Sequence, residues 1–208
     1  MKRFAVLFAA GMVLGISAGA NADPVTYVAN LNGASESPSN ASAGIGTTVV
    51  FIDPAAHTLR VVVPSFSGLS GSTTASHIHC CIAPPGNVGV ATPTPTFPGF
   101  PLGVTSGNYD RTFDTTLAST WNAAFITANG GTPAGAEAAL TAGLATGRAY
   151  MNVHTSAYPG GEIRGFLVAP PSLAAPTSEI PTLSEWTLAM LAAALATLGI
   201  LAMRRRSS

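Results

Sequence analysis

The stretch AYMNVHTSAYPGGEIRGFLV, residues 149–168, decides the fold class of this chain. Residues 148–155 and 161–168 are rich in β-branched and aromatic side chains, a composition that is typical of strands. Pro159 and Gly160 lie between them and favour a tight turn. The stretch therefore predicts two strands joined by a short turn, which is the basic unit of an antiparallel sheet.

Five segments nearer the N-terminus carry the same strand pattern of short apolar runs. They cover residues 25–33, 46–53, 58–66, 76–80 and 109–117. Pro54 follows Asp53 directly and predicts a chain reversal, so the second and third of these segments form a hairpin. Seven short strands separated by turn residues predict an all-β fold, an antiparallel β-sandwich.

Two segments interrupt the strand pattern. Residues 84–103 contain six prolines and predict a long loop in extended conformation. Residues 118–128 and 134–144 have helical character and are separated by Asn129 and two glycines. We therefore expect two short helices inserted between the strands.

The N-terminus has the pattern of a secretory signal peptide over residues 1–22. Lys2 and Arg3 precede an apolar run at residues 4–16, and the small residues of the sequence ANA end at position 22. Charge, apolar run and cleavage pattern occur in the order that such signals require. We expect cleavage after residue 22 and export of the remaining chain.

The C-terminus has the pattern of a membrane anchor. A proline-rich linker at residues 169–180 precedes a terminal segment at residues 181–208. Residues 186–203 carry no charged side chain, and three arginines come directly after them. This length is near the lower limit for a spanning helix, and an arginine tail stays on the cytoplasmic side. We expect a C-terminal transmembrane helix that makes the membrane itself a partner.

The body between these ends is mildly acidic. Residues 23–178 contain four arginines, no lysine and seven acidic residues, a net charge of −3. This composition gives no basic patch for nucleic acid, which we exclude as a partner. Residues 23–168 are long enough for one domain with its own core.

Two motifs of the body resemble the CHRD domain, a family named after chordin and frequent in exported bacterial proteins. They are SHIHCC at residues 76–81, with GNVGV at residues 86–90 after it, and the stretch at residues 149–168. The resemblance covers about residues 25–168 and implies an immunoglobulin-like sandwich. It implies little about activity, although in chordin these domains are associated with binding growth-factor partners.

The sequence IPTLSEW, residues 180–186, resembles the IPTL type of the PEP-CTERM sorting signals. Thr187 stands where such signals usually have glycine. The resemblance implies processing by a membrane protease of the exosortase type in a Gram-negative bacterium. The protein is then either anchored by its helix or released to the cell surface.

Three of the four histidines lie on predicted strands. His77 and His79 flank one residue and therefore share a face, and His154 shares a face with Tyr150 and Asn152. One interpretation is a copper or zinc site, since imidazole suits both metals, and the layout resembles the copper site of Cu/Zn superoxide dismutase. The other, which the sequence favours, is that the three rings bond loop backbone and that no cofactor is present.

Cys80 and Cys81 are the only cysteines of the chain and are adjacent. An oxidising location favours a disulfide, and a bridge between neighbours forms a constrained turn. Two free thiols, thiolate ligation beside His77 and His79, and a bridge between two chains are the alternatives.

Glu162 and Arg164 are two residues apart on one predicted strand and therefore lie on one side of it. We expect an exposed ion pair that contributes less than about 1 kcal/mol, so that Glu162→Gln barely changes stability. Ile163 then faces the core, where an aspartate would stop folding.

Two functions remain open. The first is a non-enzymatic surface or extracellular-matrix protein that binds a protein or a polysaccharide. The alternative is an exported protein that binds copper or zinc through its histidines, with superoxide-dismutase-like chemistry as an extension. The sequence shows no nucleophile triad, phosphate-binding loop or carboxylate pair, and we expect no catalytic residue.

Overall fold

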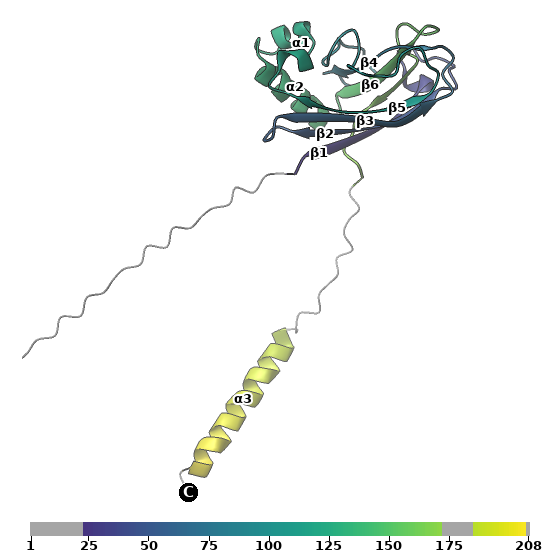
Figure 1. Cartoon of the computed structure of the whole chain (residues 1–208). Coiled ribbons are helices and arrows are strands. Elements are labelled where there is room, and N and C mark those ends of the chain that lie inside the picture. Colours follow the sequence, from purple (N-terminus) through teal and green to yellow (C-terminus); the bar gives the residue numbers. More distant parts are fainter. Residues whose placement is uncertain (1–22, 172–184, 207–208) are drawn as a thin grey trace, which may run out of the picture. The chain divides into compact units, whose positions relative to one another are not determined.

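The computed structural model describes residues 23–171 and 185–206, which form two units, a β domain and a separate helix (Figure 1). Seven strands make one antiparallel sheet in the order β4-β6-β7-β1-β2-β3-β5. Their bounds are β1 Val25–Asn32, β2 Ile45–Asp53, β3 Thr58–Ser67, β4 Thr73–Cys80, β5 Gly107–Asp114, β6 Ala149–Thr155 and β7 Ile163–Phe166. The predicted all-β, antiparallel class is confirmed.

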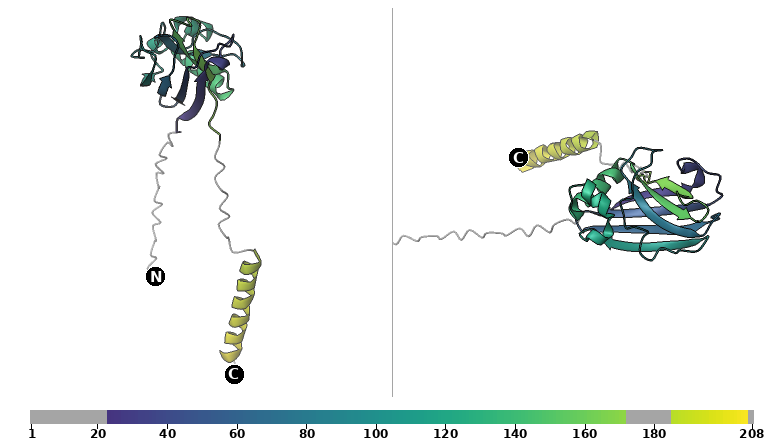
Figure 2. Two further views of the ribbon diagram at one scale, coloured as in Figure 1. Left: turned by 90° about the vertical axis from the view of Figure 1, so that its right-hand side faces the viewer. Right: turned by 90° about the horizontal axis from the view of Figure 1, so that it is seen from above.

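The sheet curls, so that its two halves face each other like the layers of a sandwich. Figure 1 shows β4 and β6 above the layer of β1, β2, β3 and β5, and Figure 2 shows the strands of the two layers crossing. The two halves meet where β1 pairs with β7, through Asn32 with Arg164 and a bridge from Val28 to Val168. The layers are therefore halves of one continuous sheet and not two separate sheets.

The core lies between the two halves and takes alternate residues from each strand. Val61 and Ile52 come from one half, and Ile78, Met151 and Ile163 from the other; all are fully buried. Burying such a side chain stabilises the fold by roughly 1.5–3 kcal/mol. The period-two pattern of the strands thus supplies the core face of both layers, with Ile163 placed as the sequence predicts.

The predicted hairpin joins β2 to β3. The Asp53 carboxylate accepts hydrogen bonds from the backbone N–H groups of Ala55 and Ala56, both at 2.9 Å. An aspartate that bonds its own following backbone in this way favours a reversal. The turn is therefore determined locally.

Of the first predicted helix, residues 118–128, only Ala123–Ala128 is α-helical and forms α1. The second predicted helix forms α2, Pro133–Ala145, and the two helices contact each other at one end of the β domain (Figure 2). Two short 3-10 turns, η1 at Gly33–Ser35 and η2 at Ala118–Thr120, complete the elements of the β domain. Thr132 caps α2 by accepting a hydrogen bond from the N–H of Gly135. Buried residues of α2, Leu140 among them, anchor it on the core.

The proline-rich loop between β4 and β5 runs along the edge strand β4. The N–H of Phe97 donates to the Ser76 carbonyl at 3.0 Å, and the N–H of Ala91 donates to the Ile78 carbonyl at 2.9 Å. Phe97 is fully buried in the core. The loop therefore covers an edge that would otherwise expose unpaired backbone groups.

Helix α3, Glu185–Arg206, contains a candidate membrane span at Thr187–Arg205. This segment of 19 residues is apolar and long enough to cross a bilayer. The predicted signal peptide at residues 1–22 and most of the predicted linker at residues 169–180 lie outside the described residues.

Candidate metal site

The pairing of β4 with β6 brings three histidines onto one face of the sheet. His77 lies opposite Asn152 and His79 opposite Tyr150, while His154 comes two residues after Asn152 on the same face. The ring centroid of His77 is 5.1 Å from that of His79 and 4.7 Å from that of His154. One ligand nitrogen from each ring lies within 4.8 Å of the other two. The three predicted histidines thus form one cluster.

Two rings are oriented by loop carbonyls. Nδ1 of His79 donates to the Val88 carbonyl at 2.7 Å, and Nδ1 of His154 donates to the Pro159 carbonyl at 2.9 Å. A carbonyl only accepts, so Nδ1 carries the proton and Nε2 carries the lone pair in both rings. Both Nε2 atoms and Nδ1 of His77 are buried and have no hydrogen-bond partner among the described residues.

Burial keeps the three rings uncharged. It lowers the pKa of His77 to about 3, with a further lowering by His154 and His79 and an opposing hydrogen bond to the backbone of Pro95. It lowers the pKa of His79 to about 4 and also lowers that of His154. At neutral pH all three are neutral, the state in which imidazole binds a metal.

The cluster fits a zinc or copper ion. Bonds from zinc to nitrogen are about 2.0–2.1 Å, so two nitrogens on one ion lie at most about 4.2 Å apart. The nitrogens of the cluster are within 4.8 Å of one another, so small side-chain rotations bring them to bonding distance. A carbonyl on the second ring nitrogen, as at His79 and His154, is the usual outer partner of a metal-bound histidine.

The predicted ion pair between Glu162 and Arg164 is wrong, because both side chains are fully buried and each has other partners. The carboxylate of Glu162 accepts from the hydroxyls of Ser42 and Thr155 and from the N–H of Ser70, each at 2.5 Å. Burial alone would raise the pKa of Glu162, but these hydrogen bonds outweigh it and lower the pKa. Glu162 is therefore a buried carboxylate that organises loops.

Arg164 binds loop backbone and a different acid. Its guanidinium donates to the carbonyl of Ser35 at 2.5 Å, to that of Pro85 at 2.8 Å and to Oδ1 of Asn87 at 2.6 Å. Its Nε lies 3.8 Å from Oε2 of Glu36, which is itself buried. No pattern in the sequence points to Glu36 as a partner, since it lies far from Arg164 along the chain.

Glu162 and Arg164 are buried because loops cover the outer face of β6 and β7. Alternation along a strand tells which residues share a face, but not whether that face meets solvent. Here the proline-rich loop and η1 lie over it, as the bonds of Arg164 to Pro85, Asn87 and Ser35 show. A face predicted as exposed is therefore a second, polar interior.

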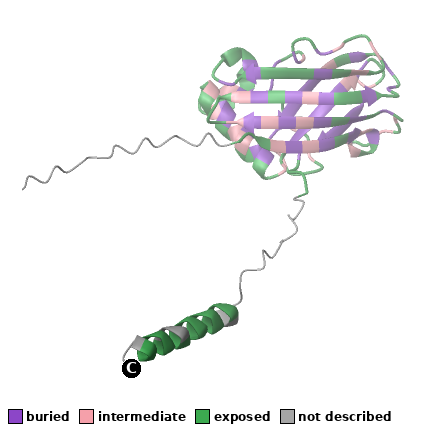
Figure 3. Ribbon diagram, turned by 60° about the horizontal axis from the view of Figure 1, so that its bottom comes forward, coloured by how far each residue is buried: buried purple, intermediate pink, exposed green. Residues whose placement is uncertain are grey.

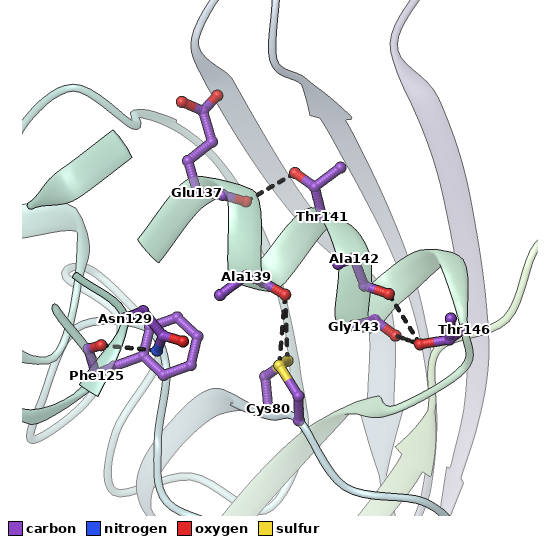
Figure 4. Close-up of a disulfide and its surroundings, with 10 residues drawn as sticks. Cys80, Phe125, Asn129, Glu137, Ala139, Thr141, Ala142, Gly143 and Thr146 are labelled. Atoms are coloured by element: carbon purple, nitrogen blue, oxygen red, sulfur yellow. Dashed lines mark hydrogen bonds between the residues drawn. A yellow bond between two sulfur atoms is a disulfide. The ribbon is translucent and has the colours of Figure 1, made fainter. Parts of the chain in front are cut away.

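Cys80 and Cys81 are joined by a disulfide, which packs against α2 (Figure 4). Both sulfurs lie near the Ala139 carbonyl, at 3.9 Å for Cys80 and 3.4 Å for Cys81. A Cβ added at Gly143 would lie 2.2 Å from Sγ of Cys80, so α2 approaches this closely only with glycine there. As a disulfide, the pair offers no thiolate beside the histidines.

Fold and site together define a mostly β domain with a buried histidine cluster, followed along the chain by an apolar helix. A family model for the CHRD domain matches residues 27–167, and a model for the IPTL-CTERM motif matches residues 180–205. The chain belongs to the CHRD domain family, as the resemblance implied. Searches of curated proteins and of solved structures gave no match.

The two family matches and the apolar helix indicate an exported bacterial protein that is anchored in a membrane. The sorting motif at residues 180–205 includes the candidate span at Thr187–Arg205. Association with a membrane and with a sorting machinery is consistent with this arrangement.

Proposed function

We propose that this protein is an exported, non-enzymatic CHRD module that binds one copper or zinc ion through His77, His79 and His154. Two observations carry the proposal: the three histidines offer one ligand atom each within 4.8 Å of one another, and each ring has a buried nitrogen without a partner among the described residues. The purely structural interpretation of these histidines accounts for the nitrogens that bond carbonyls. It leaves the unpaired nitrogen of each ring unexplained.

An unpaired buried polar atom destabilises a fold by about 1–3 kcal/mol. Three such atoms lie on the three rings of one cluster, and Nε2 of His79 and of His154 carries a lone pair, so one electron-pair acceptor would satisfy them together. A metal ion is such a partner and supplies a Lewis acid that binds all three. The chain itself orients the rings through the carbonyls of Val88 and Pro159 and keeps them neutral by burial.

The delivery of the module is the second part of the proposal. A Gram-negative bacterium exports it through the inner membrane, and an exosortase-type protease processes the sorting signal. The body then lies outside that membrane, held by its helix or released to the cell surface or matrix, where it binds an extracellular protein or a polysaccharide. The order of a CHRD domain before a sorting motif supports this route.

The metal is tested by metal analysis and titration calorimetry of the full mature chain in detergent. One equivalent of copper or zinc is expected in the wild type and none in His154→Ala. The matched control is His57→Ala, because His57 lies outside the cluster and bonds Glu137. Equal metal content in all three proteins, or loss in the control as well, contradicts the proposal.

A further inference from the structure

The histidine cluster offers an uncharged set of ligands. Its three rings are neutral, the Glu162 carboxylate is occupied by hydroxyl and N–H donors, and the two cysteines are oxidised. These ligands bring no negative charge, so they do not neutralise a metal ion bound in this buried site. The charges around the cluster therefore decide which ion is favoured.

A fixed positive charge lies close behind the cluster. The ring of Tyr150 stacks on that of His79, with centroids 4.7 Å apart and an angle of 4° between the planes. The guanidinium carbon of Arg164 lies 4.8 Å from the centroid of the Tyr150 ring. These three groups form a layered stack, which we call the His79–Tyr150–Arg164 stack, and its outer member is a fully buried cation.

The effect of Arg164 reaches the cluster. Only the ring of Tyr150 separates the Arg164 guanidinium from the ring of His79, and Arg164 is fully buried. A buried cation at this place repels any positive charge bound at the His79 ring, because the protein interior screens charges weakly. Its repulsion doubles when the charge of the bound ion doubles.

The counter-charge of Arg164 is incomplete. Glu36 lies 3.8 Å from its Nε, and burial raises the pKa of Glu36 to about 7 although Arg164 lowers it. The hydrogen bonds of Arg164 to Ser35, Pro85 and Asn87 go to uncharged acceptors. Part of the positive charge therefore remains uncompensated near neutral pH.

From this arrangement we infer that the three-histidine site, given that it binds metal as proposed above, takes copper as Cu(I) in preference to Cu(II) and Zn(II). Moving an ion into a medium of low dielectric constant costs energy in proportion to the square of its charge, so a divalent ion costs about four times as much. The Irving–Williams order favours Cu(II) among divalent ions at nitrogen ligands. Burial, three neutral ligands and the His79–Tyr150–Arg164 stack oppose that order here.

The test compares three ions on the full mature chain in detergent. Cu(I) affinity is measured without oxygen, with ascorbate, by competition with a chromophoric chelator, and Cu(II) and Zn(II) by matched competitions. The expected result is one equivalent of Cu(I), bound at least about tenfold more tightly than either divalent ion. Failure of all three ions to bind overturns the proposed function, whereas tighter binding of a divalent ion overturns only the present inference.

Two variants separate charge from packing. Glu36→Gln removes the counter-charge with little change of shape, and at pH 8 it should raise the ratio of Cu(I) to Cu(II) affinity about tenfold, equivalent to about 59 mV in the copper potential. Arg164→Met should lower that ratio, while Arg164→Lys keeps the charge and should retain it. If Arg164→Met does not fold, Glu36→Gln carries the test alone. A potential that stays the same in Glu36→Gln overturns the role of this charge.

Discussion

Two ion pairs of the β domain differ in almost every respect except their chemistry. Arg60 and Asp110 lie on β3 and β5, about half exposed, with a two-point contact at 2.9 and 2.6 Å. Arg164 and Glu36 lie 3.8 Å apart and are nearly inaccessible, on the covered face of β7 and in the chain after η1. The contrast teaches that the loop over a sheet face, and not the strand sequence, decides what a charge does there.

The surrounding faces differ in the same way. Figure 3 shows exposed and buried residues alternating along the strands of the front layer, where one face meets solvent. On β6 the residues are buried at almost every position, because loops cover the second face of this strand. Charged groups on the open face stay hydrated after folding. Those on the covered face lose their water and need hydrogen-bond or ion-pair partners within the protein.

The largest effect that tests this comparison is expected at Glu162. Glu162→Gln puts an amide N–H₂ among the groups that donate to the carboxylate, and leaves a donor such as the buried Thr155 hydroxyl without its acceptor. We expect a loss of about 3 kcal/mol or more in the free energy of unfolding, measured by urea denaturation. A loss below about 1 kcal/mol would mean that the face behaves as an exposed one, as its sequence suggests.

A smaller effect concerns the pH dependence of Glu36. Its pKa is raised from 4.5 to about 7, so between these values the folded state binds more protons than the unfolded state. The contribution of Glu36 to the free energy of unfolding is therefore fully present below about pH 4.5. It is lost as the pH rises through 7, by up to about 3 kcal/mol.

The measurement is the difference in unfolding free energy between wild type and Glu36→Gln at pH 5 and pH 8, with a chelator present. The pKa values of His77 and His79 in the folded protein, about 3 and 4, lie below this range, so the difference reports mainly on Glu36. The wild type should lose stability relative to the variant on going to pH 8. A difference that does not change with pH contradicts the raised pKa.

The contact of α2 with the disulfide gives the next effect. A methyl group at Gly143 would meet Sγ of Cys80 and Cys81, so Gly143→Ala should destabilise by about 1–3 kcal/mol. Gly89→Ala is the matched control, because nothing lies within 4 Å of its added Cβ. Thermal unfolding of both variants checks this, and equal melting temperatures would show that α2 can move away.

The smallest effect is expected on the open face. Asp110→Asn removes the negative charge opposite Arg60 and one of its two acceptors, where both groups are about half exposed. We expect the urea midpoint to stay within the error of the measurement, and added salt to leave the difference unchanged. A loss similar to that of Glu162→Gln would remove the distinction between the two faces.

Much of the fold was predictable because it is local. The reversal after Asp53 follows from its own backbone bonds, and the start of α2 follows from Thr132 and the proline after it. The outer partners of Arg164 were not predictable, since Glu36 and Asn87 come from distant segments. No local pattern in the sequence indicates that these residues contact Arg164.

The histidine cluster was likewise predictable only in part. That His77 and His79 share a face follows from the strand period of two, which every strand obeys. That His154 joins them depends on the pairing of β4 with β6, and on the loop carbonyls that turn two of the rings. The strands, the turns and the residues that share a face follow from local sequence, because each depends on residues close together along the chain. Which strands pair and which face is covered follow from the three-dimensional fold, because both depend on how the whole chain buries its apolar surface.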